Sequence, residues 1–427
     1  MEGDKVIEKG TILVEGNRIT AVGEEFEVKI PGDAYVMDCG GKTIIPGLVD
    51  VHAHLGNTGN GISPQQQWSY FAHLAYGVTT THDPSSSTEM VFNQSEMVKA
   101  GRLIGPRIYS TGTILYGADG DFKAVVNSLD DARSHLRRLK AVGAFSVKSY
   151  NQPRRDQRQQ VMQAARELEM NVYPEGGSFF YHNLNQMVDG HTGIEHSIPV
   201  SPVYKDVIQL WGASETGYTP TLIVGYGGIW GENYWYQKSE VWKNERLLTY
   251  YPRRLLDARS IRRMMIPDED FGHVGNAETA KELAEGGVQV QLGAHGQLHG
   301  LGAHWELWMI GQGGFSNLEA LRAGTLWGAE YIGMDKDIGS LEVGKLADLV
   351  VLDANPLEDL TNTEFVDYVM LNGRLYDSAN MNEVGNYNTP RKKFFWERAK
   401  GSDAFPWHEA TKSFMDNKCS CFGHQHN

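Results

Sequence analysis

Strand-like and helix-like segments alternate along the middle of this chain, and this alternation restricts its fold more than any other feature. The apolar, β-branched runs end near residues 83, 150, 176, 197, 224 and 295. Helical patterns include RDQRQQVMQAARELE at 155–169 and NLEALRAGTLWGAEYI at 317–332. Strands that alternate with helices form parallel sheets, and this many repeats favours a closed sheet over an open one. The sequence therefore predicts an α/β protein built on a (β/α)8 TIM barrel.

Two antiparallel patches flank this alternating region. The segment 6–25 alternates apolar and polar residues around a turn at Gly16-Asn17, and the segment 347–377 has a second turn at Asn372-Gly373. We expect the patches to meet in one small β-sandwich domain. The predicted division is residues 1–45 plus 344–378 for this domain, 46–343 for the barrel and 379–427 for a C-terminal tail. The abrupt start at Met1 suggests a piece cut from a longer protein.

Composition excludes some classes of function. A chain of 427 residues that is 41% apolar can bury a core large enough for a barrel and an accessory domain. Its formal net charge of -14 argues against a nucleic-acid-binding surface, because phosphate contacts need clustered lysine and arginine. No stretch approaches the roughly 20 apolar residues that span a bilayer, and the N-terminus lacks a signal-peptide core. We expect a soluble protein, cytoplasmic, or periplasmic if it was cut from a longer exported protein.

The tail has a different character from the rest of the chain. Three cysteines in all are too few for a disulfide framework, so they neither require nor exclude an oxidising compartment. The last residues hold four possible soft metal ligands, Cys419, Cys421, His424 and His426. Structural zinc sites usually space their ligand pairs with more intervening chain, so a flexible or packing extension is favoured over a metal site. Exchange of this tail within a homo-oligomer is a further hypothesis.

The segment LVDVHAHLG, residues 48–56, is an apolar run that ends in two histidines. Residues two apart in a strand point to the same face, so His52 and His54 would converge on one point. Such a pair also occurs by chance on solvated edge strands. Here Pro46-Gly47 interrupts the chain just before the run, which favours a short interior strand that delivers polar groups at its carboxyl end. Barrels keep their chemistry at that end.

Other strand ends carry polar groups of suitable kinds, namely Lys148, Glu175, His196 and His295. Taken singly, each has a structural explanation: a lysine with its amine at the surface, a glutamate that caps a helix, or a histidine that donates to a carbonyl. Together with the two histidines of the first strand, they predict a metal cluster at the carboxyl ends of the strands.

Several motifs resemble the metal-dependent amidohydrolase superfamily, close to its imidazolonepropionase-like and prolidase-like members. These motifs are IIPGLVDVHAH, YGVTT, VKSY, GIEH and EALRAGTLWGAEYIGMDKDIGSLEVGKLADLVVLDANP. The segments PEGGS, GHTGIEHSIP and LGAHGQLHGLGAHWEL are similar to the amidohydrolase portion of proteins that carry a β-propeller ahead of it. Such an origin would account for the abrupt start.

The resemblance implies a binuclear site. Two strand-1 histidines bind one metal, a carboxylated lysine bridges two metals, histidines on strands 5 and 6 bind the second, and a strand-8 aspartate binds metal and moves the proton. His52, His54, Lys148 and His196 match this pattern. Glu175 stands in place of the strand-5 histidine and His295 in place of the aspartate, which leaves the formal charge unchanged. Both substitutes can bind zinc, so we interpret the set as exchanged ligands.

The expected activity is hydrolysis of a carbon-nitrogen bond by a metal-activated hydroxide, with zinc favoured and manganese the alternative. The resemblance favours a dipeptide or an N-acyl amino acid as substrate, and His295 as the proton shuttle. Cyclic amide, lactone or carbamate hydrolysis and deamination are alternatives within enzymes. A mononuclear site with unmodified Lys148 and a non-catalytic binding module also stay open.

Residues near the expected mouth of the barrel are candidates for substrate contact. Tyr150 shares the face of Lys148, Tyr226 follows a strand-like run, and His299 lies in a glycine-rich loop beyond His295. The adjacent His82 and Asp83 are interpreted as a hydrogen-bonded pair that orients the site. His304 and Glu306 are expected on the following helix. For the helix expected at 317–332, Ser316 and Glu319 form a capping-box pattern and Gly333 suits its C-terminal end.

Overall fold

The computed structural model describes residue 1 and residues 5–56, 61–117, 123–177, 179–225, 228–261 and 264–397. The chain divides into two compact units, residues 1–389 and 390–427. In the described part of the second unit, Arg391 and Glu397 form an ion pair of 2.6 Å beside the short 3-10 helix Phe395–Glu397. The cysteines and histidines at the end of the tail lie outside the described residues.

The first unit contains parallel strands in three sheets. The first sheet has the order β4-β5-β6, the second β10-β9-β7-β8 and the third β11-β12, and every pairing within them is parallel. The bounds are β4 Leu48–Asp50, β5 Val78–Asp83, β6 Arg107–Ser110, β7 Ile114–Tyr116, β8 Lys123–Val125, β9 Ser146–Ser149, β10 Asn171–Pro174, β11 Gly193–Glu195 and β12 Gly217–Thr219.

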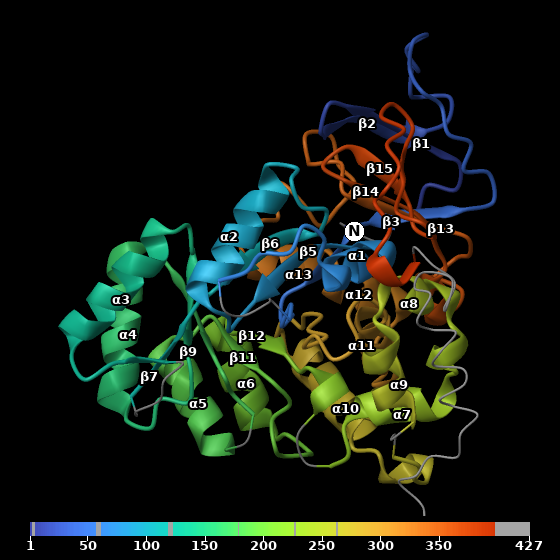
Figure 1. Cartoon of the computed structure of the whole chain (residues 1–427). Coiled ribbons are helices and arrows are strands. Elements are labelled where there is room, and N and C mark those ends of the chain that lie inside the picture. Colours follow the sequence, from blue (N-terminus) through green and yellow to red (C-terminus); the bar gives the residue numbers. More distant parts are fainter. Residues whose placement is uncertain are drawn as a thin grey trace, which may run out of the picture. The chain divides into compact units, whose positions relative to one another are not determined.

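Helices separate most of these strands along the chain (Figure 1). Their bounds are α1 Trp68–Ala75, α2 Thr88–Lys99, α3 Leu129–Ala141, α4 Arg155–Leu168, α5 Phe180–Asp189, α6 Lys205–Ser214, η1 Leu222–Val224, α7 Gly231–Lys238, α8 Glu245–Tyr250, α9 Arg253–Ile261, α10 His273–Glu285, α11 Leu301–Gln312, α12 Asn317–Ala323 and α13 Leu326–Tyr331. Among the described helices, none combines the length and the apolar character that a membrane crossing requires.

An aliphatic core lies between the second sheet and helices α3 and α4, which Figure 1 shows side by side. Val147 of β9 and Val172 of β10 meet Leu136 of α3 and Val161 of α4 in this core, where all four side chains are buried. Neighbouring residues of a strand point to opposite faces, so Lys148 faces away from these helices. The strand therefore directs Lys148 to the face of the sheet opposite these helices, where its side chain is also buried.

The described residues do not show one closed sheet. The segment 288–295, which we expected as a strand, makes only an isolated bridge between Val290 and Tyr218. Its backbone nevertheless reaches both neighbours, because Gln289 O accepts from Tyr218 N at 2.9 Å and Leu292 O accepts from Val51 N at 3.0 Å. The α/β class and the parallel strands are confirmed. Strands this short offer few ladder bonds, and the closed (β/α)8 barrel stays a prediction.

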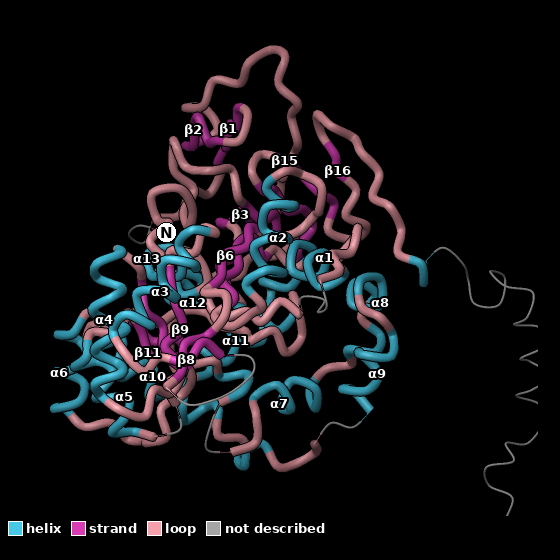
Figure 2. Tube along the Cα trace, turned by 60° about the vertical axis from the view of Figure 1, so that its left-hand side comes forward, coloured by secondary structure: helices cyan, strands magenta, loops and turns pink. Residues whose placement is uncertain are grey.

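Segments from far apart in the chain form an antiparallel sheet of order β16-β15-β14-β13-β3. Their bounds are β3 Thr43–Pro46, β13 Leu349–Leu352, β14 Val366–Leu371, β15 Arg374–Asp377 and β16 Glu383–Val384, and a separate hairpin joins β1 Gly10–Glu15 to β2 Arg18–Glu24. Both expected turns lie between paired strands. Figures 1 and 2 show these strands at one end of the first unit. The sandwich packing and the domain boundaries remain predictions.

The helix expected at residues 317–332 is two helices, α12 and α13. The break lies at Thr325, whose φ of -136° and ψ of -91° are not helical. The Thr325 hydroxyl donates to Leu321 O at 2.6 Å, a side-chain bond that competes with continued helix formation. The predicted capping box is confirmed, because the Ser316 hydroxyl accepts from Glu319 N while the Glu319 carboxylate accepts from Ser316 N.

Loss of this capping box should weaken the fold measurably. Replacing Ser316 by alanine leaves the amide of Glu319 without its side-chain acceptor, so we expect the free energy of unfolding to fall by about 1 kcal/mol. Urea unfolding followed by circular dichroism measures the change. Ser239→Ala is the matched control, since this hydroxyl lies at the C-terminal end of α7 and donates to Trp235 O. Equal stability of the two variants would contradict the prediction.

Candidate metal centre

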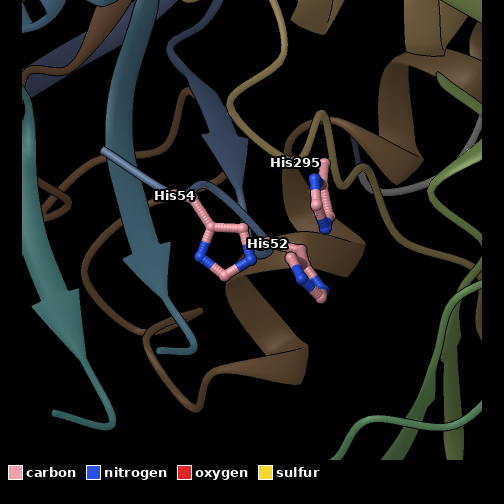
Figure 3. A group of neighbouring side chains, drawn as sticks. All are labelled: His52, His54 and His295. Carbon is pink, nitrogen blue, oxygen red and sulfur yellow. The ribbon is translucent and has the colours of Figure 1, made fainter. Parts of the chain in front are cut away.

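Three of the predicted ligands gather at one point in the described residues (Figure 3). One ring nitrogen from each of His52, His54 and His295 lies within 4.8 Å of the other two. The ring centroids of His54 and His295 are 4.6 Å apart, and those of His52 and His295 are 5.1 Å apart. Three imidazoles at this spacing can share one metal ion.

The other three predicted ligands lie next to this group. Lys148 Nζ is 2.6 Å from Glu175 Oε2, and His196 Nε2 is 3.2 Å from Glu175 Oε1. The His196 ring lies 4.8 Å from the ring of His52 and 5.1 Å from that of His295, measured between centroids. The fold thus brings together all six residues that the sequence marked as candidate ligands.

Two of the histidines reach the cluster through unusual backbone conformations. His196 has a φ of 69° and His295 a φ of 60°, in the left-handed region that residues with a side chain rarely adopt. Each such residue costs roughly 1–3 kcal/mol and persists only where the surroundings hold it. The amide of His295 donates to His52 O at 2.7 Å, which fixes one of the two conformations directly against the first strand.

The surroundings favour the neutral form of His52 and His295 and the ionised form of Glu175. Burial lowers the pKa of His52 well below its usual value, and Lys148 and the neighbouring histidines lower it further. Burial and the neighbouring histidines also lower the pKa of His295. Burial alone would raise the pKa of Glu175, but Lys148 and His196 outweigh that effect and hold it below its ordinary range. Neutral imidazoles and an ionised carboxylate are the states that bind a metal.

The hydrogen bonds of His52 suit a metal ligand. Its Nδ1 is 2.5 Å from Glu195 Oε2, so this nitrogen carries the proton and donates to the carboxylate. Its Nε2 is buried and has no hydrogen-bond partner among the described residues. A ligating histidine commonly gives its second N–H to a carboxylate in this way. The residues present therefore fit a divalent metal ion.

Sequence reasoning missed the groups that support these ligands. Glu195 also accepts from the Tyr331 hydroxyl at 2.6 Å, and burial raises the pKa of Glu195 to about 7. Alternation would turn Glu195 and His196 to opposite faces, but β11 ends at Glu195 and the left-handed backbone of His196 brings both side chains to His52. Asp50, inside LVDVHAH, accepts from the amides of His52 at 3.2 Å and Ala294 at 3.1 Å. Its position within the motif was the one available signal.

Comparison with known proteins identifies relatives of the chain. Residues 276–376 match the amidohydrolase family model. Imidazolonepropionase of Symbiobacterium thermophilum is 24% identical over 387 residues, which cover 82% of this chain and 85% of that enzyme. Enamidase of Eubacterium barkeri is 40% identical over 77 residues, which cover 18% of this chain and 19% of the enamidase. A solved Xaa-Pro dipeptidase with bound methionine in the active site shares the fold, with a TM-score of 0.68, 21% identity and coverage of 88% of this chain and 97% of that one.

The resemblance to imidazolonepropionase-like and prolidase-like amidohydrolases that we inferred from the motifs is confirmed by the family match and by the similarity to imidazolonepropionase. The family match contains His295, whereas His52 and His54 lie far ahead of it in the sequence. The site therefore combines residues inside and outside the matched segment.

The three residues that we expected to contact substrate have different surroundings. Tyr150 is half-buried, with its ring centroid 6.0 Å from Lys148 Nζ. His299 is buried, and its Nδ1 lies 3.2 Å from Nε2 of His73. Tyr226 lies outside the described residues. Substrate contact by these residues stays a prediction.

The expected hydrogen bond between His82 and Asp83 is wrong. His82 lies 3.2 Å from Val51 O through Nδ1 and 2.9 Å from the Ser146 hydroxyl through Nε2. Asp83 instead lies 3.4 Å from His54 Nδ1. Adjacent residues of β5 point to opposite faces, so they cannot pair with each other. Asp83 therefore lies beside the cluster, next to His54. His304 and Glu306 lie on α11, as expected.

Proposed function

We propose that this amidohydrolase is a metal-dependent hydrolase that cleaves the carbon-nitrogen bond of a small amide, such as a dipeptide or an N-acyl amino acid. The main support is the convergence of the six candidate ligands on one buried cluster. The amidohydrolase family match and the imidazolonepropionase and Xaa-Pro dipeptidase relatives support hydrolysis of carbon-nitrogen bonds. The closed barrel is part of the same proposal, because such sites lie at the carboxyl ends of barrel strands.

We propose a centre with two divalent ions, most suitably zinc. His52 and His54 would hold one ion, Glu175 and His196 the other, with His295 completing the set. Lys148 can bridge them only as a carbamate, formed when Nζ bonds to the carbon of carbon dioxide and loses a proton. Unmodified Lys148 paired with Glu175 at 2.6 Å would instead leave one metal at the three histidines. That mononuclear centre is the second candidate.

When bound, a divalent ion supplies Lewis-acid chemistry that acidifies water and polarises the substrate carbonyl. The chain itself contributes orientation, since Glu195 fixes His52 and Asp83 contacts His54. His295 is proposed to pass the proton to the leaving amine. One nitrogen cannot hold a metal and a proton together, so His295 would act as ligand and as base in different steps.

Metal content is the first test of this proposal. Protein purified without chelator should contain about two zinc or manganese ions per chain by plasma mass spectrometry. The expected number is two because the cluster offers two sets of ligands, which comprise histidines and the Glu175 carboxylate. Glu175→Ala and His295→Ala should each lower the content, whereas Glu285→Ala, at an exposed position of α10, should not. One ion per chain would select the mononuclear centre. Protein grown with ample zinc that holds none would overturn the hydrolase and favour a non-catalytic binding module.

Substrate class needs a separate test. We expect metal-loaded protein to hydrolyse members of a panel of dipeptides and N-acyl amino acids, detected as released amine. Cyclic amides, lactones, carbamates and amino-substituted heterocycles test the alternatives of cyclic amidohydrolase, lactone or carbamate hydrolase and deaminase. Turnover of only one of these other classes would overturn the amide assignment while leaving the metal centre intact.

A further inference from the structure

A chain of hydrogen bonds connects His295 to two helices outside the metal cluster. His295 Nδ1 lies 3.3 Å from Gln297 Oε1, and Gln297 Nε2 donates to Glu232 Oε1 at 3.1 Å. Glu232, on α7, accepts at its other oxygen from Arg259 Nη1, on α9, at 3.1 Å. Arg259 also donates to the backbone oxygen of Gln297. Four residues from three parts of the chain are thus joined in one series.

The chemistry of the outer members fixes the direction of every bond in this series. Arginine can only donate, and an ionised carboxylate can only accept. Both oxygens of Glu232 accept, Oε1 from Gln297 Nε2 and Oε2 from Arg259 Nη1, and these two partners oppose the rise in pKa that burial causes. The Gln297 amide must then turn its NH2 group toward Glu232 and its oxygen toward His295. An amide oxygen only accepts, so His295 must donate through Nδ1.

We propose that Gln297, Glu232 and Arg259 are positioning residues that hold His295 as the Nδ1–H tautomer and leave the lone pair of Nε2 for the metal centre. The proposal rests on the proposed function, in which His295 takes part in that centre. The hydrogen bond at one ring nitrogen decides the state of the other, as in metal sites where a carboxylate or carbonyl receives the second N–H. Here the amide oxygen of Gln297 receives the Nδ1–H of His295, and the buried carboxylate of Glu232 accepts from the same amide.

The substitution at this position explains why such a network is needed. The resemblance would place an aspartate where His295 stands, and a carboxylate has no tautomers. A histidine can carry its proton on the wrong nitrogen, and then it has no lone pair to offer to the cluster. The left-handed backbone of His295 and its amide bond to His52 O place the residue but leave the tautomer undetermined. Gln297, two residues further on, supplies the missing constraint.

The first test reads the tautomer directly in metal-free protein that carries 15N-labelled histidine. Long-range proton-nitrogen NMR spectra distinguish Nδ1–H from Nε2–H, and His295→Gln assigns the signals. We expect wild type to show Nδ1–H at His295 and Gln297→Met to show a mixture of tautomers. Chelator competition should then give a zinc Kd about 10–100-fold weaker for Gln297→Met. Gln237→Met, on α7 but bonded to Ile266 O, is the matched control and should match wild type in both measurements.

A double variant tests the direction of the bonds and does not depend on the methionine variant being folded. Glu232→Gln combined with Gln297→Glu exchanges the amide and the carboxylate. Arg259 can then donate to the new amide oxygen, the amide can donate to the new carboxylate, and that carboxylate can accept from His295 Nδ1. We expect Nδ1–H at His295 to persist and the zinc Kd to stay within about threefold of wild type, since every donor keeps an acceptor.

The outcomes separate this inference from the proposed function. Failure of wild type to bind zinc would remove the proposed metal centre, while the NMR spectra would still report the tautomer. Zinc binding by wild type together with Nε2–H at His295 would overturn the network. So would a Gln297→Met protein that is folded by circular dichroism and keeps the wild-type tautomer and zinc Kd. Loss of Nδ1–H in the double variant would overturn it as well.

Discussion

Replacing His52 by alanine should reduce hydrolysis about a thousandfold, the effect of losing about 4 kcal/mol of transition-state stabilisation. His52 is the candidate ligand at the centre of the cluster, since its ring centroid lies about 5 Å from those of His54, His196 and His295. Removing the imidazole also leaves the Glu195 carboxylate without its partner, His52 Nδ1, which lies 2.5 Å from Glu195 Oε2. The measurement is kcat/KM on the best substrate of the panel, together with metal content after dialysis.

Two further variants show whether this loss belongs to the metal centre. Glu195→Gln should weaken metal binding by about 10–100-fold, the usual cost of removing the partner of a ligating histidine. His135→Ala is the matched control, because this half-buried histidine of α3 contacts Val125 O, away from the cluster. Retention of metal and activity by His52→Ala would show that the cluster is not the reacting centre.

Substitution of Glu306 should change how stability depends on pH. Glu306 is fully buried on α11, where its two oxygens accept from the amides of Leu222 and Ile223 in η1. Burial, together with repulsion from Asp50, raises the pKa of Glu306 to about 8 against these two bonds. Between the unfolded pKa near 4.5 and this value, the unfolded chain releases the proton and the folded chain keeps it. The contribution of Glu306 to stability is therefore present at low pH and is lost as the pH rises toward 8.

The expected measurement is a difference in the free energy of unfolding between wild type and Glu306→Met at several pH values. The methionine variant should be destabilised most at pH 4.5 and below, and the difference in the free energy of unfolding should narrow by about 1.4 kcal/mol per pH unit from there to pH 8. Asn185→Met, at an exposed position of α5, is the control, because it removes no titratable group and its difference from wild type should not change with pH. A gap for Glu306→Met that widens with pH would show that the buried carboxyl is ionised in the folded protein.

The sequence predicts local elements of this fold better than their closure into one sheet. Hydrophobic alternation and turn chemistry located the hairpin turns at Gly16-Asn17 and Asn372-Gly373, because these depend on neighbouring residues. Residues 288–295 bond to β12 and to the residues just after β4, which lie far away in the sequence, so a local pattern does not reveal these bonds. The break at Thr325 depends on a side-chain bond inside an otherwise helical pattern.

The same distinction separates the ligands from their supports. Histidine, lysine and glutamate at strand ends are conspicuous, so their residue types and positions were enough to mark them as a group. Glu195 and Gln297 act through partners distant in the sequence, Tyr331 for the first and Glu232 for the second. The left-handed backbone of His196 also defeats the rule of alternation that would have turned Glu195 away. Tertiary contacts alone define these roles.

The pairing of β3 with β13 bears on when the candidate metal centre can form during synthesis. β3 is the edge strand of its sheet, and β13 is its one strand partner in the described residues. Pro46 pairs with Leu349, and β4 follows β3 after the single residue Gly47. β3 and β4, which precede His52, therefore leave the ribosome long before β13, the strand that pairs with β3. Contacts between residues so distant in sequence form late in folding. His52 and His54 are therefore synthesised before the strand pairing that fixes the preceding segment can form.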